Sequence, residues 1–183
     1  MNDITIRPVD PEADAELIHD WVTQERAGFW GMLDKDLDEV AEIYTYIAEQ
    51  PHLSAHLVSV GDVPVTLFQT YDPAVDEIGQ YYHREPGDIG VHLLMADSPA
   101  RVGRTSDIVD FLMRRLFDDP AIRRIVLEPD ARNAKSLRLF GLIGAEMGPA
   151  VHMPHKRAQF AFLHPQSLTR ESLSQAACPP GGR

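Results

Sequence analysis

A histidine within an apolar segment is the first residue in this sequence that could do chemistry. Residues 89–95 of the stretch "GDIGVHLLM" are typical of a buried β-strand, and His92 lies in the middle of it. Such a histidine can be a hydrogen-bonded core residue, a metal ligand or a catalytic base. His83, His152 and His155 show none of the spacings of metal sites, so we expect no metal centre.

Glu128 is the second unusual residue. It ends the apolar segment 123–128 and directly precedes Pro129. Carboxylates in such positions are usually paired or functional. If strands 89–95 and 123–128 are neighbours, His92 and Glu128 approach each other and could take a proton from an amine. A purely structural His–Glu pair is the alternative.

The loop "ARVGRTSD" combines a glycine, two arginines and two hydroxyls ahead of a predicted helix. Backbone N–H groups at the start of a helix bind phosphate, and arginines add positive charge. This pattern predicts an anion-binding loop, with an ordinary solvated loop as the alternative. The residues concerned are Arg101, Gly103, Arg104, Thr105 and Ser106.

The elements that must position these residues follow from periodicity and turn residues. The pattern predicts an α/β (α+β) fold with one mixed, mostly antiparallel sheet, flanking helices and a central βαβ crossover over 89–128. Asp10 is the expected cap of the first helix and Asn133 of the last. The expected strands are 4–8, 54–60, 63–71, 89–95, 123–128, 146–153 and 157–164, and the expected helices are 10–22, 36–50, 107–117 and 133–143.

Composition limits the class of protein. The 183 residues favour one domain over 1–165, followed by a flexible C-terminal tail over 166–183. A net charge of -11 argues against nucleic acid as a partner, and the absence of an 18-residue apolar run argues against a membrane span. The one cysteine, Cys178, allows no disulfide within the chain, so we expect a cytoplasmic protein.

Four segments together resemble the GNAT-fold acyltransferases of siderophore biosynthesis. They are "IHDWVTQERAGFWG", "QYYHREPGDIGVHLLM", "RRLFDDPAIRRIVLEPDARNAKS" and "MPHKRAQF", in the order and spacing of that family. The resemblance extends from about Ile4 to His164. It implies the GNAT fold and an acyl-CoA-dependent N-acyltransferase, with acetyl-CoA or another acyl-CoA such as succinyl-CoA as co-substrate and no metal.

The resemblance also implies roles for individual residues. His92 matches the strand histidine that acts as base or acceptor anchor, and Glu128 matches the acidic position beside it. Further residues match the CoA-binding segments: Leu93, Leu94 and Met95 for the pantetheine arm, Arg101, Gly103, Arg104, Thr105 and Ser106 for the pyrophosphate, and Asn133 and Ser136 for the pantetheine end. Candidates for acceptor binding are His19, Trp21, Phe29, Trp30 and Gln69, although core packing is an equal alternative for Trp21, Phe29 and Trp30.

Two positions depart from the family pattern. In "RVGRTS", Gly103 comes one residue early and Arg104 replaces a glycine. Gln69 stands where relatives often carry a glutamate, and this change removes a negative charge that would attract a cationic amine.

The expected acceptor is an N-hydroxylated lysine, ornithine, cadaverine or putrescine, acylated to a hydroxamate by direct transfer. A flavin N-monooxygenase and a siderophore synthetase are the expected pathway neighbours. The alternatives are acylation of an unmodified amine such as an amino acid, polyamine or aminoglycoside, a non-catalytic CoA-binding protein, and a pure interaction domain. The sequence alone leaves the acyl group, the acceptor and the oligomeric state open.

Overall fold

The computed structural model describes residues 3–168. Cys178 and the predicted tail from residue 169 onward lie outside the described residues. The described chain divides into two compact units. The first unit comprises the chain up to Asp72 together with Val91–Val102, and the second comprises Pro73–Gly90 together with the chain from Gly103 onward.

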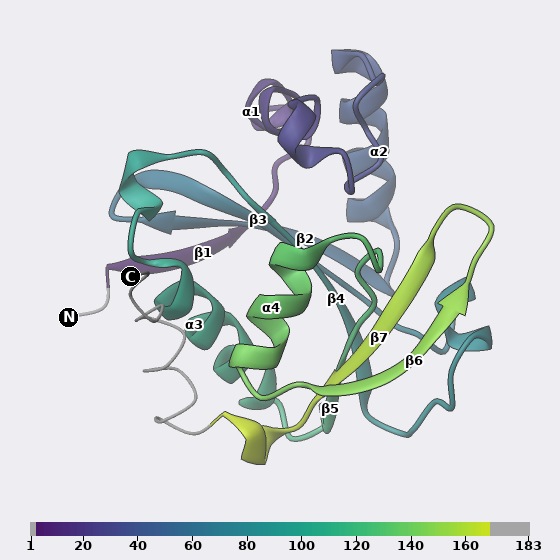
Figure 1. The fold of residues 1–183 in the computed structure, drawn as a ribbon. Coiled ribbons are helices and arrows are strands. Elements are labelled where there is room, and N and C mark those ends of the chain that lie inside the picture. The colour runs from purple at the N-terminus through teal and green to yellow at the C-terminus, as the bar shows by residue number, and fades with distance from the viewer. Residues whose placement is uncertain (1–2, 169–183) are drawn as a thin grey trace, which may run out of the picture. The chain divides into compact units, whose positions relative to one another are not determined.

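The strands form a seven-stranded sheet in the order β1-β2-β3-β4-β5-β7-β6 (Figure 1). Strand β4 (Asp88–Met95) contributes residues to both units. The predicted mixed and mostly antiparallel sheet is therefore confirmed. So is the predicted crossover, because β4 pairs in parallel with β5 (Arg124–Leu127), with Ile89 opposite Ile125.

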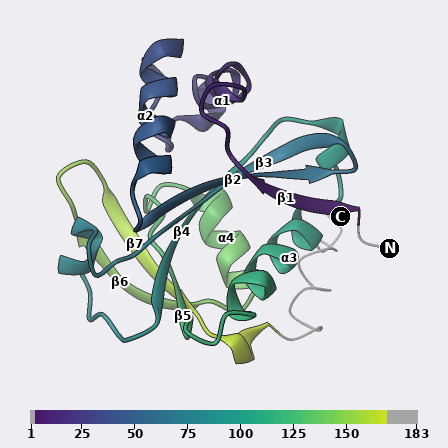
Figure 2. The same cartoon turned by 180° about the vertical axis from the view of Figure 1, so that it is seen from behind.

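The first unit holds an antiparallel meander and two helices. β2 pairs with β1 and with β3, and Gly61 makes the hairpin turn between β2 and β3 with φ +59°. Both ribbon views show α1 and α2 side by side (Figures 1 and 2). The elements are β1 (Ile4–Pro8), α1 (Ala15–Val22), η1 (Glu25–Ala27), α2 (Leu37–Glu49), β2 (Leu53–Val60), β3 (Val63–Tyr71) and η3 (Pro99–Arg101).

The predicted start of the first helix is wrong by several residues. Asp10 does accept hydrogen bonds from the N–H groups of Glu12 and Ala13 at 3.1 Å, but they form a turn ahead of the helix. The helix begins after Asp14, which is buried. Arg7 donates two hydrogen bonds of 2.7 Å to the Asp14 carboxylate and so compensates for its burial. These bonds hold the pKa of Asp14 below its usual value.

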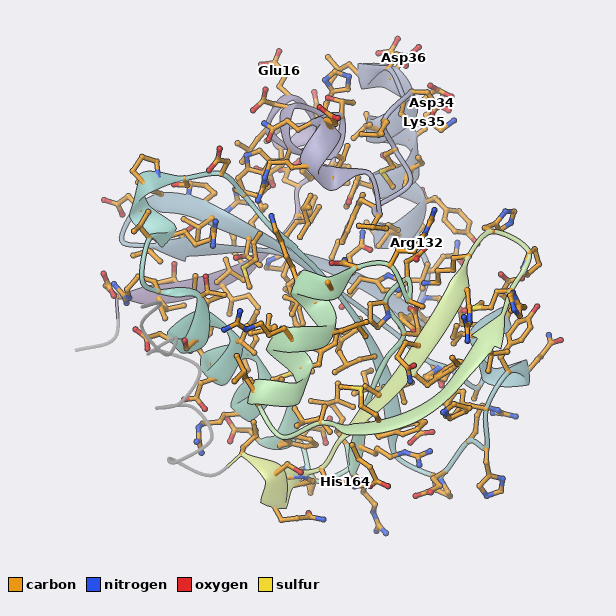
Figure 3. The ribbon with its side chains drawn as sticks, in the orientation of Figure 1. Glu16, Asp34, Lys35, Asp36, Arg132 and His164 are labelled. Carbon is orange, nitrogen blue, oxygen red and sulfur yellow. The ribbon has the colours of Figure 1, made fainter. Side chains whose placement is uncertain are left out.

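Helix α2 follows the prediction closely. Asp36 accepts a hydrogen bond from the Glu39 N–H, and the Glu39 carboxylate accepts one from the Asp36 N–H, which completes a capping box. Figure 3 shows Asp34, Lys35 and Asp36 gathered at this end of the helix. Val40 and Tyr44 of α2 pack into a core that also contains residues of α1, β2, β3 and the end of β4.

The second unit contains the other half of the sheet. β5 pairs antiparallel with β7, and β7 pairs with β6. Asn133 caps the last helix as predicted, and Gly144 follows that helix with φ +83°. The remaining elements are η2 (Glu77–Gln80), α3 (Thr105–Phe117), α4 (Ala134–Leu142), β6 (Glu146–His152), β7 (Arg157–Leu163) and η4 (Pro165–Ser167).

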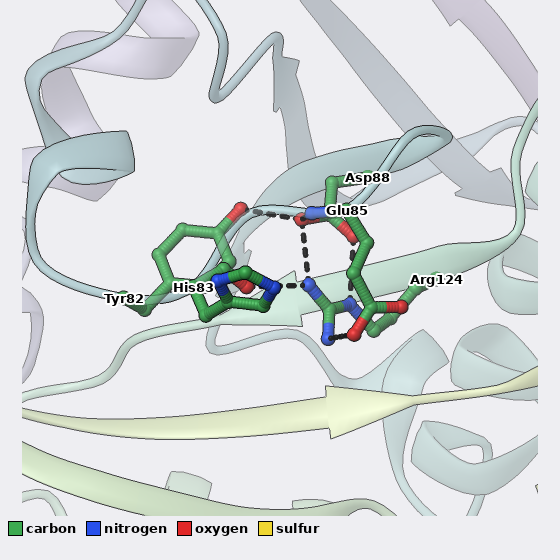
Figure 4. A network of polar contacts seen from close by, with 5 residues as sticks. All are labelled: Tyr82, His83, Glu85, Asp88 and Arg124. Atoms are coloured by element: carbon green, nitrogen blue, oxygen red, sulfur yellow. Dashed lines mark hydrogen bonds and ion pairs between the residues drawn. The ribbon is translucent and has the colours of Figure 1, made fainter.

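A buried arginine fastens the segment before β4 to β5 (Figure 4). Arg124 donates to both oxygens of Asp88 at 2.7 and 2.8 Å, to Glu85 at 2.7 Å and to the His83 carbonyl at 3.0 Å. Tyr82 donates a further bond of 2.8 Å to Asp88. Burial raises the pKa of Asp88, but the bonds from Arg124 and Tyr82 outweigh it and the net pKa is lowered. Arg124 therefore has a structural role.

No helix among residues 3–168 is long and apolar enough to cross a membrane.

Candidate active site

His92 lies on the face of β4 that also carries Leu94 and Ala96. Successive residues of a strand point to opposite faces, so these three share one face. Leu94 and Ala96 belong to the core of the first unit, whereas His92 is exposed. The exposure of His92 argues against the alternative of a buried core histidine, because the apolar packing of this face ends at Leu94.

Two aromatic rings flank His92. The Tyr71 ring lies 5.0 Å from it at a tilt of 43°, and the Trp30 ring lies 6.2 Å away edge-on. Tyr71 comes from the end of β3 and Trp30 from the loop after η1. The structure thus brings together His92 and Trp30, which the sequence predicted separately, and adds Tyr71.

A buried tyrosine joins Trp30 to Gln69. Gln69 Nε2 donates to the Tyr44 hydroxyl at 3.0 Å, and the Trp30 indole also hydrogen-bonds this hydroxyl. Burial raises the pKa of Tyr44, and the two hydrogen bonds lower it by less. Tyr44 therefore stays neutral at physiological pH. Trp30, Tyr44, Gln69, Tyr71 and His92 form what we call the His92 cluster.

The other predicted acceptor residues lie in different settings. Trp21 is 7% exposed and packs in the core, as its core-packing alternative proposed. His19 Nε2 lies 3.2 Å from the Lys35 carbonyl, and Phe29 is 53% exposed. Their part in acceptor binding stays a prediction.

The end of β4 is held by two arginines. Arg26 of η1 donates to the Met95 carbonyl at 2.7 Å, and Arg101 of η3 donates to the Ala96 carbonyl at 2.7 Å. On the same strand, Leu94 is buried and Leu93 half-buried. The Thr66 hydroxyl approaches the Met95 sulfur at 3.1 Å.

The predicted anion-binding loop leads from η3 into α3. Gly103 has φ +75°, a conformation that favours glycine, and a Cβ there would meet nothing within 4 Å. Arg104 precedes the helix and pairs with Asp107 at 3.1 Å. Thr105 and Ser106 are the first two residues of α3, so their N–H groups belong to the helix start. This arrangement suits an anion such as pyrophosphate.

Glu128 is 4% exposed and paired with Lys156 in the second unit. Lys156 Nζ also donates to the Glu128 carbonyl at 2.8 Å. Two residues after Glu128, Asp130 accepts two hydrogen bonds from the Arg132 side chain and one from the Arg132 backbone N–H. These bonds lower the pKa of Asp130 to about 2.

His92 belongs to the first unit and Glu128 to the second, and their action as a pair stays a prediction. Asn133 uses its side-chain oxygen to accept the Ser136 N–H at 3.2 Å, and CoA contact by both residues likewise stays a prediction. Within residues 3–168, the structure shows no group of three or more metal-ligating side chains placed to hold a metal ion.

Sequence reasoning missed four residues of these sites: Arg26, Tyr44, Tyr71 and Lys156. Tyr71 had a usable signal, because it stands two residues after Gln69 on one strand and therefore shares its face. Tyr44 lies within the predicted helix 36–50, where an apolar position indicates packing and not a site. Arg26 and Lys156 act through contacts distant in sequence, for which no local pattern exists.

The chain is similar to several known proteins. Among curated proteins, the N(6)-hydroxylysine O-acetyltransferase of Escherichia coli is 26% identical over 165 residues, covering 87% of this chain and 51% of that protein. An N(5)-hydroxyornithine:cis-anhydromevalonyl coenzyme A-N(5)-transacylase of Beauveria bassiana is 31% identical over 150 residues, covering 79% of this chain and 33% of that protein. The chain therefore spans about half the length of the first relative and about a third of the second.

The solved structure of AAC(6')-Ib in complex with paromomycin and acetyl-CoA superposes with a TM-score of 0.79 at 22% identity. The match covers 92% of this chain and 97% of that one, and it shows a shared fold. Residues 10–153 match the family model of the acetyltransferase (GNAT) domain. The chain belongs to the GNAT acetyltransferase family.

Proposed function

We propose that this protein transfers an acyl group from acyl-CoA to the nitrogen of a small N-hydroxylated amine. Family membership supports acyl transfer, and the start of α3 supports binding of the CoA pyrophosphate. Two relatives carry names with an N-hydroxylated lysine or ornithine, which supports the acceptor class. The product would be a hydroxamate.

The observation that carries the choice of acceptor is the position of Gln69, an uncharged amide, in the His92 cluster. Two aromatic rings lie beside His92, and Tyr44 joins Gln69 to Trp30. An alkylamine arrives as an ammonium and favours a carboxylate partner, whereas a hydroxylamine is less basic and largely uncharged at neutral pH. An amide at the position of Gln69 therefore favours the hydroxylamine.

In the proposed reaction, the acceptor nitrogen attacks the thioester carbonyl. The new N–C bond forms as the C–S bond breaks, the nitrogen loses its proton to His92 directly or through water, and the CoA thiolate leaves and is protonated. A backbone N–H near Leu93 or Leu94 would stabilise the oxyanion. Glu128, paired with Lys156, is the second acid–base candidate.

Thiol release from acetyl-CoA and succinyl-CoA tests the proposal. With N-hydroxycadaverine, CoA release should be at least about tenfold faster than with cadaverine or lysine, because the site is expected to favour an uncharged acceptor over an ammonium. Equal rates with cadaverine would contradict the hydroxylamine preference. No release with any acceptor would favour a non-catalytic CoA-binding protein.

Acetylation of an aminoglycoside is the second candidate, and the similarity to AAC(6')-Ib favours it. Kanamycin in the same assay distinguishes the two. Rates with kanamycin above those with every hydroxylamine would make the second candidate the better one.

The proposed pathway context follows from the chemistry of the substrate. An N-hydroxylated amine must come from an oxidising step, for which a flavin N-monooxygenase is suited. A hydroxamate with a free carboxyl or amino end can then be condensed by a siderophore synthetase.

A further inference from the structure

Arg26 makes a contact that neither the fold nor the proposed chemistry has used. Its side chain is exposed, and Nη1 donates to the Met95 carbonyl at 2.7 Å, across 69 positions of sequence. A guanidinium offers five N–H donors in a planar fork, and this bond uses one of them. The others are available for a further acceptor.

The direction of the Met95 carbonyl places Arg26 on a particular edge of β4. In a trans peptide the C=O of one residue points opposite to the N–H of the next. The Ala96 N–H donates to Val65 of β3 at 2.9 Å, so the Met95 carbonyl points away from β3. Arg26 therefore lies at the edge of β4 that faces away from β3.

The second arginine at this strand end has a different place. Arg101 donates to the Ala96 carbonyl, which belongs to the next peptide. Carbonyls alternate in direction along an extended chain, so this one points back toward the β3 side. Consistently, η3, which carries Arg101, contacts β3.

We propose that Arg26 binds a phosphate group of acyl-CoA, and this assignment rests on the proposed function. An extended amide-containing arm can add along a free strand edge by backbone hydrogen bonds. An arm that pairs with Leu93–Met95 on the edge away from β3 would run past Arg26. Met95 lies three residues beyond His92, about 10 Å along the strand at roughly 3.3 Å per residue.

An arm with its thioester at His92 that runs toward the C-terminal end of β4 would bring its phosphate end toward Arg26. Arginine is suited to phosphate because two parallel N–H bonds match two phosphate oxygens. The bond to Met95 holds the guanidinium in place beforehand and lowers the entropy cost of binding. The competing explanation is that Arg26 only fastens η1, and with it the loop of Trp30, to β4.

Two acyl donors separate these explanations in the full-length protein. Acetyl-CoA carries the phosphates, and S-acetylpantetheine carries the same thioester and amides without them. Arg26→Gln should raise the KM for acetyl-CoA about tenfold, the lower end for a hydrogen bond to a charged group, because the site is exposed. The kcat/KM for S-acetylpantetheine should stay unchanged. Arg26→Lys should restore part of the loss, and the effect should shrink in high salt.

Arg115→Gln serves as the matched control, since it removes one positive charge from an exposed residue in the last turn of α3. It should leave the KM for acetyl-CoA unchanged. Equal losses with both donors would show that Arg26 acts as a tether and would overturn the assignment, as would no loss with either. If the wild-type protein binds no CoA, measured by calorimetry, the proposed function fails and this assignment fails with it.

Discussion

At the scale of single residues, the surroundings of His92 separate a catalytic role from a structural one. An exposed ring on a strand contributes little to stability, whereas a ring that accepts a proton during the reaction is needed for turnover. The contacts with Trp30 and Tyr71 fix the position of the ring without burying it.

His92→Ala should therefore lower kcat about 100-fold, within the range for general acid–base residues, with little change in the free energy of unfolding. Steady-state kinetics and urea unfolding of the same preparation measure both quantities. His52→Ala, at a half-buried position after α2, is the control for loss of a histidine. A destabilised His92→Ala protein with near-normal kcat would show that the residue is structural.

Gln69 provides a test of acceptor charge. Its Nε2 donates to Tyr44, which a glutamate cannot do, so the carboxylate in Gln69→Glu would instead accept a hydrogen bond from the Tyr44 hydroxyl and add a negative charge to the His92 cluster. We expect the preference for N-hydroxycadaverine over cadaverine, as a ratio of kcat/KM, to fall about tenfold, because a carboxylate favours an ammonium.

Gln80→Glu makes the same change on the exposed end of η2 and should leave that ratio unchanged. If both variants shift the ratio equally, the effect comes from the net charge of the protein. If neither shifts it, Gln69 does not select the acceptor.

At the scale of elements, the loop before α3 depends on the backbone of Gly103. An alanine at φ +75° costs about 1 kcal/mol in conformational energy, although its Cβ would meet nothing within 4 Å. The loop can relieve this strain only by moving the N–H groups at the start of α3. Gly103→Ala should raise the KM for acetyl-CoA roughly fivefold, the factor that corresponds to 1 kcal/mol.

Gly61→Ala is a matched control, since Gly61 also has a positive φ and open space but turns between β2 and β3. It should cost similar stability and leave the KM for acetyl-CoA unchanged. An equal rise in KM for both variants would mean that lost stability, and not the loop before α3, affects CoA.

The sequence predicts elements better than it predicts contacts. Every predicted strand and helix exists, because apolar periodicity, the caps Asp36 and Asn133 and the turn glycines are local signals. The start of α1 was misjudged because the Arg7–Asp14 pair, formed between β1 and the helix, competes with the local cap at Asp10. Likewise, the partners of Glu128 and Met95 come from distant segments and leave no pattern near either residue.

At the scale of the whole molecule, carboxylates paired with arginines couple stability to pH. The pKa values of Asp14, Asp88 and Asp130 are all lowered in the folded protein, that of Asp130 to about 2. In the unfolded chain an aspartate has a pKa of about 3.9. Their contribution is therefore present above pH of about 4 and is lost as pH falls toward 2, where the folded protein must also bind protons.

The free energy of unfolding should thus be nearly constant from neutral pH to about 5 and fall steeply below about 4.

Arg124→Met removes the partner of Asp88 and should cost about 3–5 kcal/mol at pH 7, as for breaking a buried ion pair. It should also reduce the loss of stability on acidification, because Asp88 then no longer has an arginine to lower its pKa. Lys35→Met, which breaks a solvent-screened pair with Glu39 on α2, should leave the free energy of unfolding nearly unchanged. Urea unfolding between pH 2 and 7 measures the free energy of unfolding of the wild-type protein and of both variants. If Arg124→Met and Lys35→Met were equally mild, the Arg124 network would be a surface feature and not the bond that holds the segment before β4 to β5.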